Sequence, residues 1–323
     1  MPHDVTLIPG SGVGPVIAEV AKDVLAHAGV TIAWDVQPCE NGDISGAVAS
    51  IQRTGVALKG ALAAPVRVGK LPPSLQLRKD LGVDTILRHV KHIPGLPARA
   101  TGTDIVVIRE ASEDIYSGFE HQSTEGVFES VKVTTRAACE RITTFAFEYA
   151  KANGRGKVTT VHKANIMKKA DGLFLAVGRE MAARYPEIKH EDVIVDALCM
   201  KIVRRPRDFD VLVCGNLFGD IVSDCAAGMA GGPTVAVGRS QGPGVVIFEN
   251  PHGEVIEGND PTMANPYPAI VLAGQLAEHL GEAGAAARIR AAVQACLEAG
   301  VHTADMGGGA SCAMVREAVL KAL

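Results

Sequence analysis

Short apolar runs alternate with longer stretches in which apolar residues recur every three or four positions, and this pattern extends over almost the whole chain. Short apolar runs favour buried strands, and the longer spacing favours helices with one buried face. The predicted strands are Val5–Ile8, Thr31–Val36, Ile105–Ile108, Lys157–Val161, Val193–Val195, Val211–Cys214, Thr234–Val237 and Val245–Phe248. The predicted helices are Val16–His27, Thr135–Asn153, Lys168–Tyr185, Leu217–Met229, Pro268–Leu280 and Ala285–Ala299. Because strands and helices alternate, the sequence predicts an α/β fold.

One segment departs from this alternation. Residues Ser123–Thr134 (STEGVFESVKVT) alternate polar and apolar positions with a period of two, which indicates additional β-structure, such as an arm or a hairpin. No internal repeat and no low-complexity linker is found in the sequence. Any domain boundary must therefore be crossed by structured chain.

The stretch PGSGVGP at residues 9–15 resembles a phosphate-binding loop, because it lies between the first predicted strand and the first predicted helix. A dinucleotide-binding fingerprint requires G-x-G-x-x-G and an acidic residue about 20 positions later, at the end of a strand. Here Pro15 occupies the place of the third glycine, and Asp35 lies inside an alternating strand. We interpret the loop as a tight strand-to-helix turn, with a Rossmann-type site as the less favoured alternative.

The composition restricts the classes of function that the chain can have. Its 323 residues suffice for two domains, and a net charge of −4 gives no positive surface for nucleic acid. No apolar run is long enough to span a membrane, and the N-terminal MPHDVTLIPG lacks the features of a signal peptide. The 7 cysteines form no CxxC pair, which favours free thiols in a reducing compartment. We therefore expect a cytoplasmic enzyme that binds neither nucleic acid nor a membrane.

The stretch NLFGDIVSD contains a candidate metal site. Asp220 and Asp224 are spaced i, i+4 in a helical pattern, so both carboxylates lie on one helix face. They repel each other unless a cation or a basic group lies between them, and carboxylate oxygens suit Mg²⁺ or Mn²⁺. Asp196, at the end of the run VIVD, could supply a third oxygen. The alternative is that the helical aspartates simply face solvent.

Candidate groups for proton transfer and for substrate binding lie elsewhere in the chain. Lys163 follows a predicted strand and precedes a helix, where active-site groups of α/β proteins gather, although it could equally be a surface lysine. Asn165 could cap that helix. Tyr116, one of 4 tyrosines, could act as a general acid or simply pack. Three arginines could together bind a substrate with several carboxylates, or each could form a surface ion pair: Arg78, Arg88 and Arg109.

Taken together, several long segments resemble the β-decarboxylating dehydrogenases, which comprise the isocitrate, isopropylmalate, homoisocitrate and tartrate/malate enzymes. The matching segments are VTLIPGSGVGP, LRKDLGVDTILR, IREASEDIYSGFEH, VHKANIMKKADGLF, VDALCMKIV, FDVLVCGNLFGDIVSD, NPHG, MANP and HTADMGGGAS, and they extend nearly from end to end. The resemblance implies a two-domain α/β fold that is not a Rossmann fold. It also implies that PGSGVGP is the family's first strand-to-helix turn and that a later loop holds the cofactor.

The resemblance implies a role for each candidate residue. Tyr116 and Lys163 would be the acid/base pair, and Asp196, Asp220 and Asp224 would hold the divalent metal. The other implied substrate residues are Arg78, Arg88, Arg109 and Asn165. In the family, the lysine and the first metal aspartate come from the neighbouring subunit, which implies a homodimer with shared active sites. The implied reaction is oxidation of a malate hydroxyl, followed by loss of CO₂ and protonation of the enol carbon.

The resemblance also indicates the cofactor. The adenine loop of the family corresponds here to HGEVIEGNDPTMANP, residues 252–266, which has diverged in its middle. Glu257 occupies the position of an aspartate in NAD-dependent members, and a carboxylate there would repel a 2′-phosphate. The sequence therefore predicts NAD rather than NADP. The implied cofactor-binding residues are Glu249, His252, Gly253, Glu257 and Asn265.

The segment that precedes Arg78 governs the choice of substrate in this family. Isocitrate enzymes have S-x-N-x-x-x-R there, whereas this chain has Pro72 at the serine position and Ser74 at the asparagine position. The motif YSGFEH favours the NAD-dependent isocitrate branch, so we expect isocitrate or an isocitrate-like acid, handled by a specialised paralogue. The alternatives are 3-isopropylmalate, homoisocitrate or tartrate/malate dehydrogenase activity, or a non-catalytic regulatory subunit.

The resemblance also predicts the domain organisation. A discontinuous large domain would comprise residues 1–88 and 239–323 and would carry the cofactor loop. An inserted smaller domain, residues 89–238, would carry the dimer contacts and the metal aspartates.

Overall fold

The computed structural model describes residues 1–63, 71–251 and 260–323, and the chain divides into two compact units. Unit 1 comprises Met1–Leu81, His92–Thr101 and Gly231–Leu323, and unit 2 comprises Gly82–Lys91 and Gly102–Ala230. The sequence placed the boundaries after residues 88 and 238, whereas the chain enters unit 2 at Gly82 and leaves it after Ala230. The connection 92–101 belongs to unit 1.

Unit 1 is built on a mostly parallel sheet. Its strands lie in the order β2 (Ile32–Val36), β1 (His3–Ile8), β3 (Val56–Lys59), β12 (Val245–Glu249) and β11 (Gly238–Gly242). All neighbours are parallel except β11, which pairs with β12 in the antiparallel direction. The helices of unit 1 are α1 (Gly14–His27), α2 (Ser45–Thr54), α3 (Pro73–Asp80), α8 (Tyr267–His279), α9 (Ala283–Glu298) and α10 (Cys312–Ala322).

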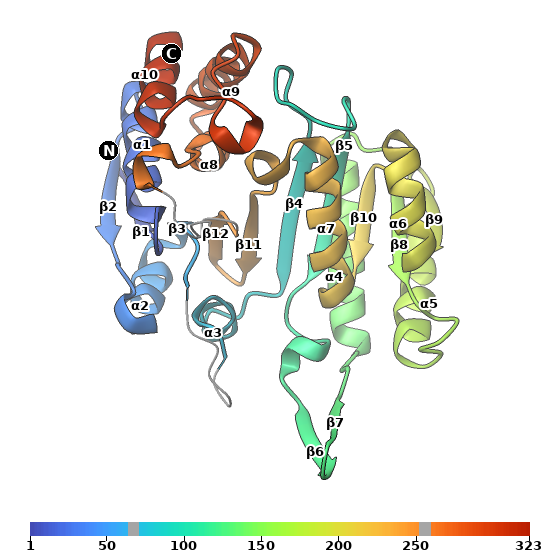
Figure 1. Cartoon of the computed structure of the whole chain (residues 1–323). Coiled ribbons are helices and arrows are strands. Elements are labelled where there is room, and N and C mark those ends of the chain that lie inside the picture. The colour runs from blue at the N-terminus through green and yellow to red at the C-terminus, as the bar shows by residue number, and fades with distance from the viewer. Residues whose placement is uncertain (64–70, 252–259) are drawn as a thin grey trace. The chain divides into compact units, whose positions relative to one another are not determined.

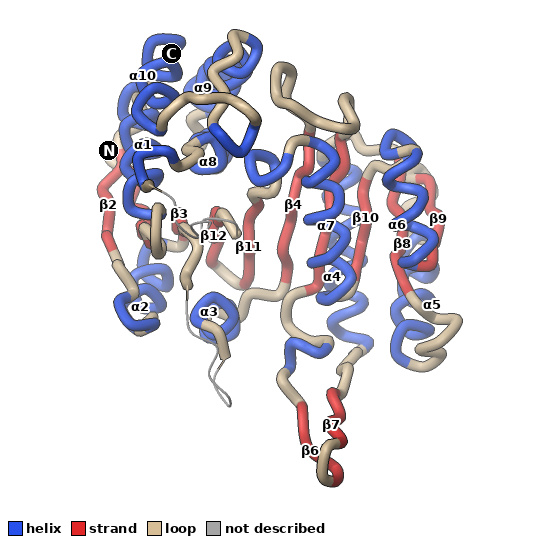
Figure 2. Tube along the Cα trace, viewed as in Figure 1, coloured by secondary structure: helices blue, strands red, loops and turns tan. Residues whose placement is uncertain are grey.

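Unit 2 repeats this plan with helices on both faces of its sheet. Its strands lie in the order β4 (Thr85–Lys91), β5 (Asp104–Glu110), β10 (Val211–Cys214), β8 (Lys157–His162) and β9 (Lys189–Ile194), and only β4 is antiparallel to its neighbour. One face is covered by α4 (Arg136–Ala152) and α5 (Ala170–Ala182), and the other by α6 (Val195–Arg204) and α7 (Asn216–Ala230), as Figure 1 shows. The alternation of helices and strands predicted from the sequence is visible in Figure 2.

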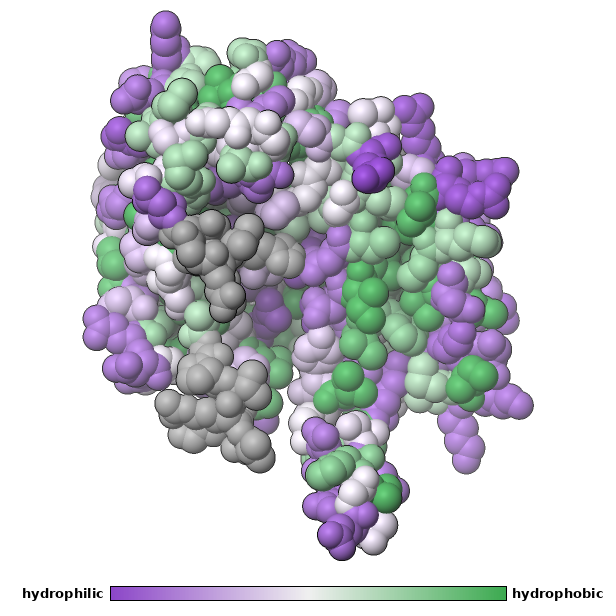
Figure 3. Space-filling model, in the orientation of Figure 1, coloured by the Kyte–Doolittle hydropathy of each residue, from purple (hydrophilic) through white to green (hydrophobic). Residues whose placement is uncertain are grey.

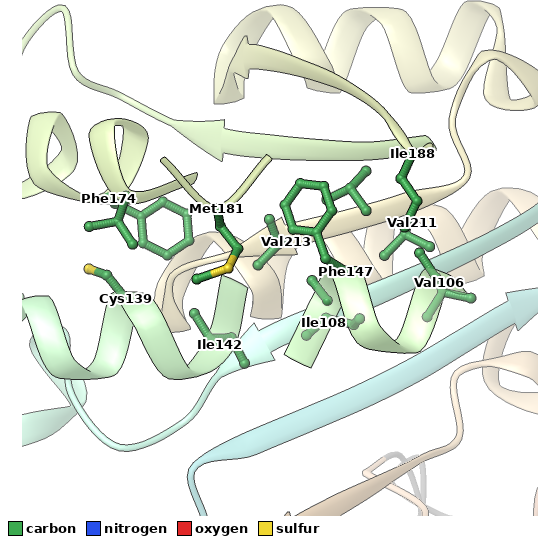
Figure 4. Close-up of a cluster of buried hydrophobic side chains, with 14 of the residues drawn as sticks. Val106, Ile108, Cys139, Ile142, Phe147, Phe174, Met181, Ile188, Val211 and Val213 are labelled. Atoms are coloured by element: carbon green, nitrogen blue, oxygen red, sulfur yellow. The ribbon is translucent and has the colours of Figure 1, made fainter. Parts of the chain in front are cut away.

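The main core of unit 2 lies between α4, α5 and the sheet (Figure 4). Ile142 and Phe147 of α4 meet Phe174 and Met181 of α5 over Val211 of β10, and all five side chains are buried. The ring of Phe147 also stacks on Tyr185, with 5.3 Å between the ring centroids. This packing holds α4 and α5 on one face of the sheet and leaves the other face to α6 and α7.

The glycine-rich turn after β1 is explained by packing within unit 1. Gly10 has a φ of +88°, and a Cβ there would lie 2.6 Å from the carbonyl oxygen of Ala61. A Cβ on Gly14 would lie 2.4 Å from the oxygen of Pro9. Helix α1 begins directly after this turn, with Pro15 in its first turn, where a missing amide hydrogen costs nothing. The glycines thus allow the close strand-to-helix turn that the sequence predicted.

A two-stranded hairpin extends from unit 2. It consists of β6 (Glu120–Thr124) and β7 (Val127–Ser130), and every residue of both strands is exposed. The sequence predicted β-structure over Ser123–Thr134, and the hairpin begins earlier, at Glu120. Among the large apolar side chains of this region, Phe119 and Phe128 are exposed by 61% and 66%.

Two predicted strands are wrong in detail. Residues Gly232–Val235 form a 3₁₀ helix in place of the predicted strand Thr234–Val237, because Gly231 and Gly232 have positive φ values and Pro233 cannot donate a strand hydrogen bond. Strand β9 spans Lys189–Ile194, whereas the sequence predicted a strand at Val193–Val195. Helix α6 begins at Val195, so Asp196 lies in its first turn. The elements that the sequence did not predict are α2, β3, α3, β4, α6, β11 and α10.

The structure also bears on membrane-spanning helices and on the state of the cysteines. None of the described helices combines the length and the apolar character that crossing a membrane requires. All seven cysteines are free, and Cys139, Cys214, Cys296 and Cys312 are buried. Burial raises the pKa of the Cys139 thiol to about 12, so this thiol is unreactive at neutral pH.

Replacing Phe147 with alanine should lower the free energy of unfolding by about 3–5 kcal/mol, because the substitution would leave a cavity in a fully packed core. The matched control is Phe128→Ala on the exposed hairpin, for which we expect a change within about 0.5 kcal/mol. Urea unfolding followed by circular dichroism measures both values. Equal losses in the two variants would contradict the assignment of the core.

Candidate active site

Two guanidinium groups, two carboxylates and one phenol meet in unit 2 where β4 and β5 face α7. Arg88 of β4 forms an ion pair with Asp224, and Arg109 of β5 forms one with Asp220. The hydroxyl of Tyr116 donates to Oδ2 of Asp220 at 2.5 Å. The structure therefore brings together five of the residues singled out in the sequence. The two aspartates lie on one face of α7, as their spacing predicted.

Two further residues of α7 position Arg109, and the sequence analysis did not identify either. Asn216 is buried at the start of α7, and its Oδ1 accepts from Nε of Arg109 at 2.8 Å. Gly219 allows α7 to approach β5, because a Cβ there would lie 2.7 Å from the side chain of Arg109. Both residues lie in the stretch NLFG, directly before Asp220, so their closeness in sequence to a candidate metal ligand could have indicated them.

The surroundings of Tyr116 keep its proton in place. Partial burial and the hydrogen bond to Asp220 raise the pKa of Tyr116 to about 12, although the guanidinium of Arg109 opposes this shift. That guanidinium lies 5.1 Å from the centre of the phenol ring. At neutral pH the hydroxyl is therefore protonated and can serve as a proton donor.

Lys163 and Asp196 form a separate pair. Lys163 follows β8, Asp196 lies in the first turn of α6, and Nζ of the lysine donates to the aspartate at 2.5 Å. The hydrogen bond from Lys163 lowers the pKa of Asp196. Asn165 is exposed in the following turn, and it is not the cap of α5, since Lys169 holds that position. Lys163 is therefore partnered by one of the predicted metal ligands.

The described part of this single chain contains no group of three histidine, cysteine, aspartate or glutamate residues that could hold a metal ion. Asp196 is thus not grouped with Asp220 and Asp224 in one chain. The pair on α7 still fits a divalent cation by its chemistry, because Mg²⁺ binds through one or two protein carboxylates and completes its shell with ligand and water oxygens. Their side chains are 34% and 41% exposed, which leaves room for such a shell.

A second charged cluster lies within unit 1, around Glu249 at the end of β12. Its carboxylate is 2.8 Å from Nη2 of Arg78 and 3.3 Å from Nζ of Lys59, and it also accepts from Ser240. Burial alone would raise the pKa of Glu249, but the two cations and the hydroxyl outweigh it and hold that pKa well below its usual range. Lys59 was missed because β3 was not predicted. The expected place of Glu249 near the cofactor stays a prediction.

Arg78 has one donor without a partner in the described part of the chain. Its Nε is buried and has no hydrogen-bond partner among residues 1–63, 71–251 and 260–323. Ser74 lies one helical turn earlier in α3, so both side chains share one face of that helix. A buried guanidinium N–H without a partner costs free energy, and an anionic ligand would remove that cost. This observation favours a carboxylate-binding role for Arg78.

The predicted adenine loop is only partly described. His252, Gly253 and Glu257 lie outside the described residues. Asn265 lies two residues before the start of α8. Its Oδ1 accepts from the backbone N–H of Tyr267, and its Nδ2 donates to Asp305 at 2.9 Å. These bonds fix the amide of Asn265 in one orientation, and its predicted role toward the cofactor stays a prediction.

Comparison with known proteins finds relatives that match almost the whole chain. A family model described as isocitrate/isopropylmalate dehydrogenase matches residues 4–319. A mitochondrial regulatory subunit of NAD isocitrate dehydrogenase from Dictyostelium discoideum is 43% identical, over 98% of this chain and 89% of the relative. A mitochondrial catalytic subunit of NAD isocitrate dehydrogenase from Arabidopsis thaliana is 40% identical, over 96% of this chain and 86% of the relative.

A solved structure agrees with these relatives. The crystal structure of isocitrate dehydrogenase from Methylococcus capsulatus matches with a TM-score of 0.94 and 38% identity, covering 99% of both chains. The predicted two-domain α/β fold of this family, distinct from a Rossmann fold, is thereby confirmed. The chain belongs to the isocitrate/isopropylmalate dehydrogenase family.

Proposed function

We propose that the protein catalyses the NAD- and divalent-metal-dependent oxidative decarboxylation of a C3-substituted (R)-malate, with isocitrate or an isocitrate-like acid as substrate. The observation that carries this proposal is the cluster of Arg88, Arg109, Tyr116, Asp220 and Asp224 in unit 2. It combines binding groups for carboxylates, oxygen ligands for a cation and a protonated phenol. The relatives named as NAD isocitrate dehydrogenase subunits support the same reaction.

The arginines would bind the substrate. Arg88 and Arg109 are buried and already face carboxylates, those of the two α7 aspartates. Guanidinium groups bind carboxylates through paired N–H donors, so the same groups suit a substrate with several carboxylates. Arg78 would supply its unused Nε–H, and Ser74 would contact the C3 substituent. Asn165 would lie near the substrate and the nicotinamide.

Asp220 and Asp224 would hold the Mg²⁺ or Mn²⁺ ion, and Asp196 would join them from a second chain. When bound, the cation supplies Lewis-acid stabilisation of the negative charge that develops on the substrate oxygen. A cation on the aspartates would leave more of the guanidinium N–H groups to the substrate. The charges of the cluster therefore suit a site that binds the cation and the polycarboxylate together.

Lys163 and Tyr116 would move the protons. Lys163 would accept the proton of the substrate hydroxyl, and the carbon that bears this hydroxyl would give a hydride to NAD. The β-keto acid then loses CO₂, and Tyr116 would donate its proton to the carbon that CO₂ has left. The pKa of about 12 keeps Tyr116 protonated at neutral pH, as a donor requires.

The cofactor proposal depends on the loop around Glu257. A carboxylate at this position would accept hydrogen bonds from the ribose hydroxyls of NAD and would repel the 2′-phosphate of NADP. His252, Gly253 and Asn265 would complete the adenine-binding loop, with Glu249 nearby. The relatives whose names specify NAD support this choice.

We propose a homodimer with shared active sites as the minimal catalytic assembly. Unit 2 exposes large apolar side chains on and near α6 and α7, and Figure 3 shows hydrophobic residues gathered over these helices. They are Met200 and Val203 of α6 and Ile221 of α7, exposed by 53–58%. Exposed apolar patches mark interaction surfaces. Because the relatives include regulatory and catalytic subunits, assembly with a related chain is the alternative.

The cytoplasmic location also stands as a proposal. It is supported by the seven free thiols, which suit a reducing compartment. Cell fractionation with an antibody to the protein would test it.

Purified protein should form NADH, seen by its absorbance, when it is incubated with NAD, Mg²⁺ and isocitrate. The panel should also contain isopropylmalate, homoisocitrate, tartrate and malate. Removal of the metal with EDTA should abolish the activity, and added Mg²⁺ or Mn²⁺ should restore it. Asp220→Asn should lower kcat/KM by about 100-fold or more, because it removes a carboxylate that would hold the cation, and the cation would stabilise the charge on the substrate oxygen.

The matched control is Asp23→Asn, which removes an aspartate that pairs with Arg316 on the surface of unit 1. This variant should keep the wild-type rate. Turnover of isopropylmalate alone would replace isocitrate as the substrate. No turnover with any acid, together with activation of a related catalytic chain, would identify a regulatory subunit and refute the catalytic proposal.

Asp220→Asn should also lower the pKa of Tyr116 from about 12 toward the ordinary value of a tyrosine, about 10. The negative charge of Asp220 disfavours the phenolate, so its removal favours ionisation. Absorbance of tyrosinate between pH 9 and about 11.5 measures this change, with Tyr116→Phe in each background to identify the transition. Identical titration curves with and without the Asp220 carboxylate would contradict the hydrogen bond between Tyr116 and Asp220.

A further inference from the structure

A strained turn lies directly before Tyr116. Asp114 has a φ of +79° and a ψ of −155°, a conformation that costs a residue other than glycine about 1–3 kcal/mol. The residue is buried, and its carboxylate accepts from the backbone N–H groups of Ile115 at 2.8 Å and Leu217 at 3.1 Å. Asp114 therefore fixes the 3₁₀ segment that carries Tyr116 to the first turn of α7.

A second buried carboxylate fixes the backbone at Lys163. Asp171 lies in the first turn of α5, and its side chain is 4% exposed. Its Oδ2 accepts from the backbone N–H of Lys163 at 2.6 Å. Asp171 thus holds the turn between β8 and α5 at the residue whose side chain reaches Asp196.

One ammonium group joins these two carboxylates. Nζ of Lys132 lies 2.7 Å from Oδ1 of Asp171 and 3.6 Å from Oδ2 of Asp114. It also lies 4.9 Å from the ring centre of Phe218, and the lysine side chain is only 17% exposed. All of these groups belong to unit 2. Without Lys132, two buried carboxylates would be left near each other with one cation fewer, which is costly in a poorly solvated site.

We propose that Lys132 is a positioning residue: its ammonium group ties the turn that carries Tyr116 to the turn that carries Lys163. This inference rests on the proposed function, in which those two residues exchange protons with the substrate. Lys132 touches neither residue's functional group, and it acts through Asp114 and Asp171. It lies two residues after β7, so the segment that returns from the exposed hairpin leads directly to these two carboxylates.

The test compares Lys132→Met with Lys157→Met. Lys157 is a matched control in the same unit, because it is also 17% exposed, pairs with Glu191 at 3.0 Å and lies 5.5 Å from the ring of Phe209. Steady-state kinetics with isocitrate and NAD should show a kcat about 10- to 100-fold lower for Lys132→Met, since small misplacements of reacting groups have effects of this size. KM for isocitrate should stay within about threefold of the wild-type value.

Lys132→Arg should recover part of the lost kcat, because it restores a cation between the two carboxylates. Lys157→Met should lower the melting temperature about as much as Lys132→Met and leave kcat within about twofold of the wild-type value. If both methionine variants lose the same activity, or if neither does, Lys132 serves only stability and the proposal is wrong.

Hydrogen exchange followed by mass spectrometry tests the tether without any assay of activity. Lys132→Met should speed exchange in both segments 114–118 and 163–172, whereas Lys157→Met should leave both unchanged. An inactive wild-type protein would refute the proposed function. The exchange rates of the two segments would still show whether Lys132 holds the two turns together. Unchanged exchange in the two segments of Lys132→Met would overturn the tether whatever the activity.

Discussion

Burial of two guanidinium groups under α7 is the constraint on which the site depends. Arg88 and Arg109 are only 5% and 3% exposed, and a buried charge is tolerable only when it is paired. The carboxylates on α7 supply the partners, Gly219 lets the helix come close enough, and Asn216 fixes the orientation of Arg109. Tyr116 also donates to Asp220 of this helix. The ion pairs that neutralise the two buried arginines therefore also bring the candidate catalytic groups together.

In unit 2 the buried charge that needs partners is positive, whereas in unit 1 it is negative. There the buried group at the centre is an anion, Glu249, and two cations and a hydroxyl surround it. Removing one partner of such a buried pair costs about 3–5 kcal/mol, so the cluster is a strong local restraint. It binds Nη2 of Arg78, while Nε of that arginine has no hydrogen-bond partner in the described part of the chain. Within each unit, an ion pair between arginine and a carboxylate thus fixes the position of a guanidinium group.

The sequence predicted most of the alternating elements and the i, i+4 pair on α7, because helical periodicity is a local property. It missed β3 and α3, which are short, and with β3 it missed Lys59. It also predicted a strand up to Val195, although α6 begins at that residue and Asp196 lies in the first turn of the helix. The contacts of Lys132 with Asp114 and Asp171 were not predictable, because they join three segments far apart in the chain and depend on a strained backbone at Asp114.

In the proposed function, a divalent cation binds the α7 carboxylates beside guanidinium groups that bind the substrate. A crystal structure with Mn²⁺, isocitrate and NAD, using the anomalous signal of manganese, measures this most directly. The proposed function predicts a manganese peak about 2.1 Å from oxygens of Asp220 and Asp224, with Arg88 and Arg109 bound to substrate carboxylates. A manganese peak away from α7, with both aspartates still paired to their arginines and isocitrate bound elsewhere, would contradict it.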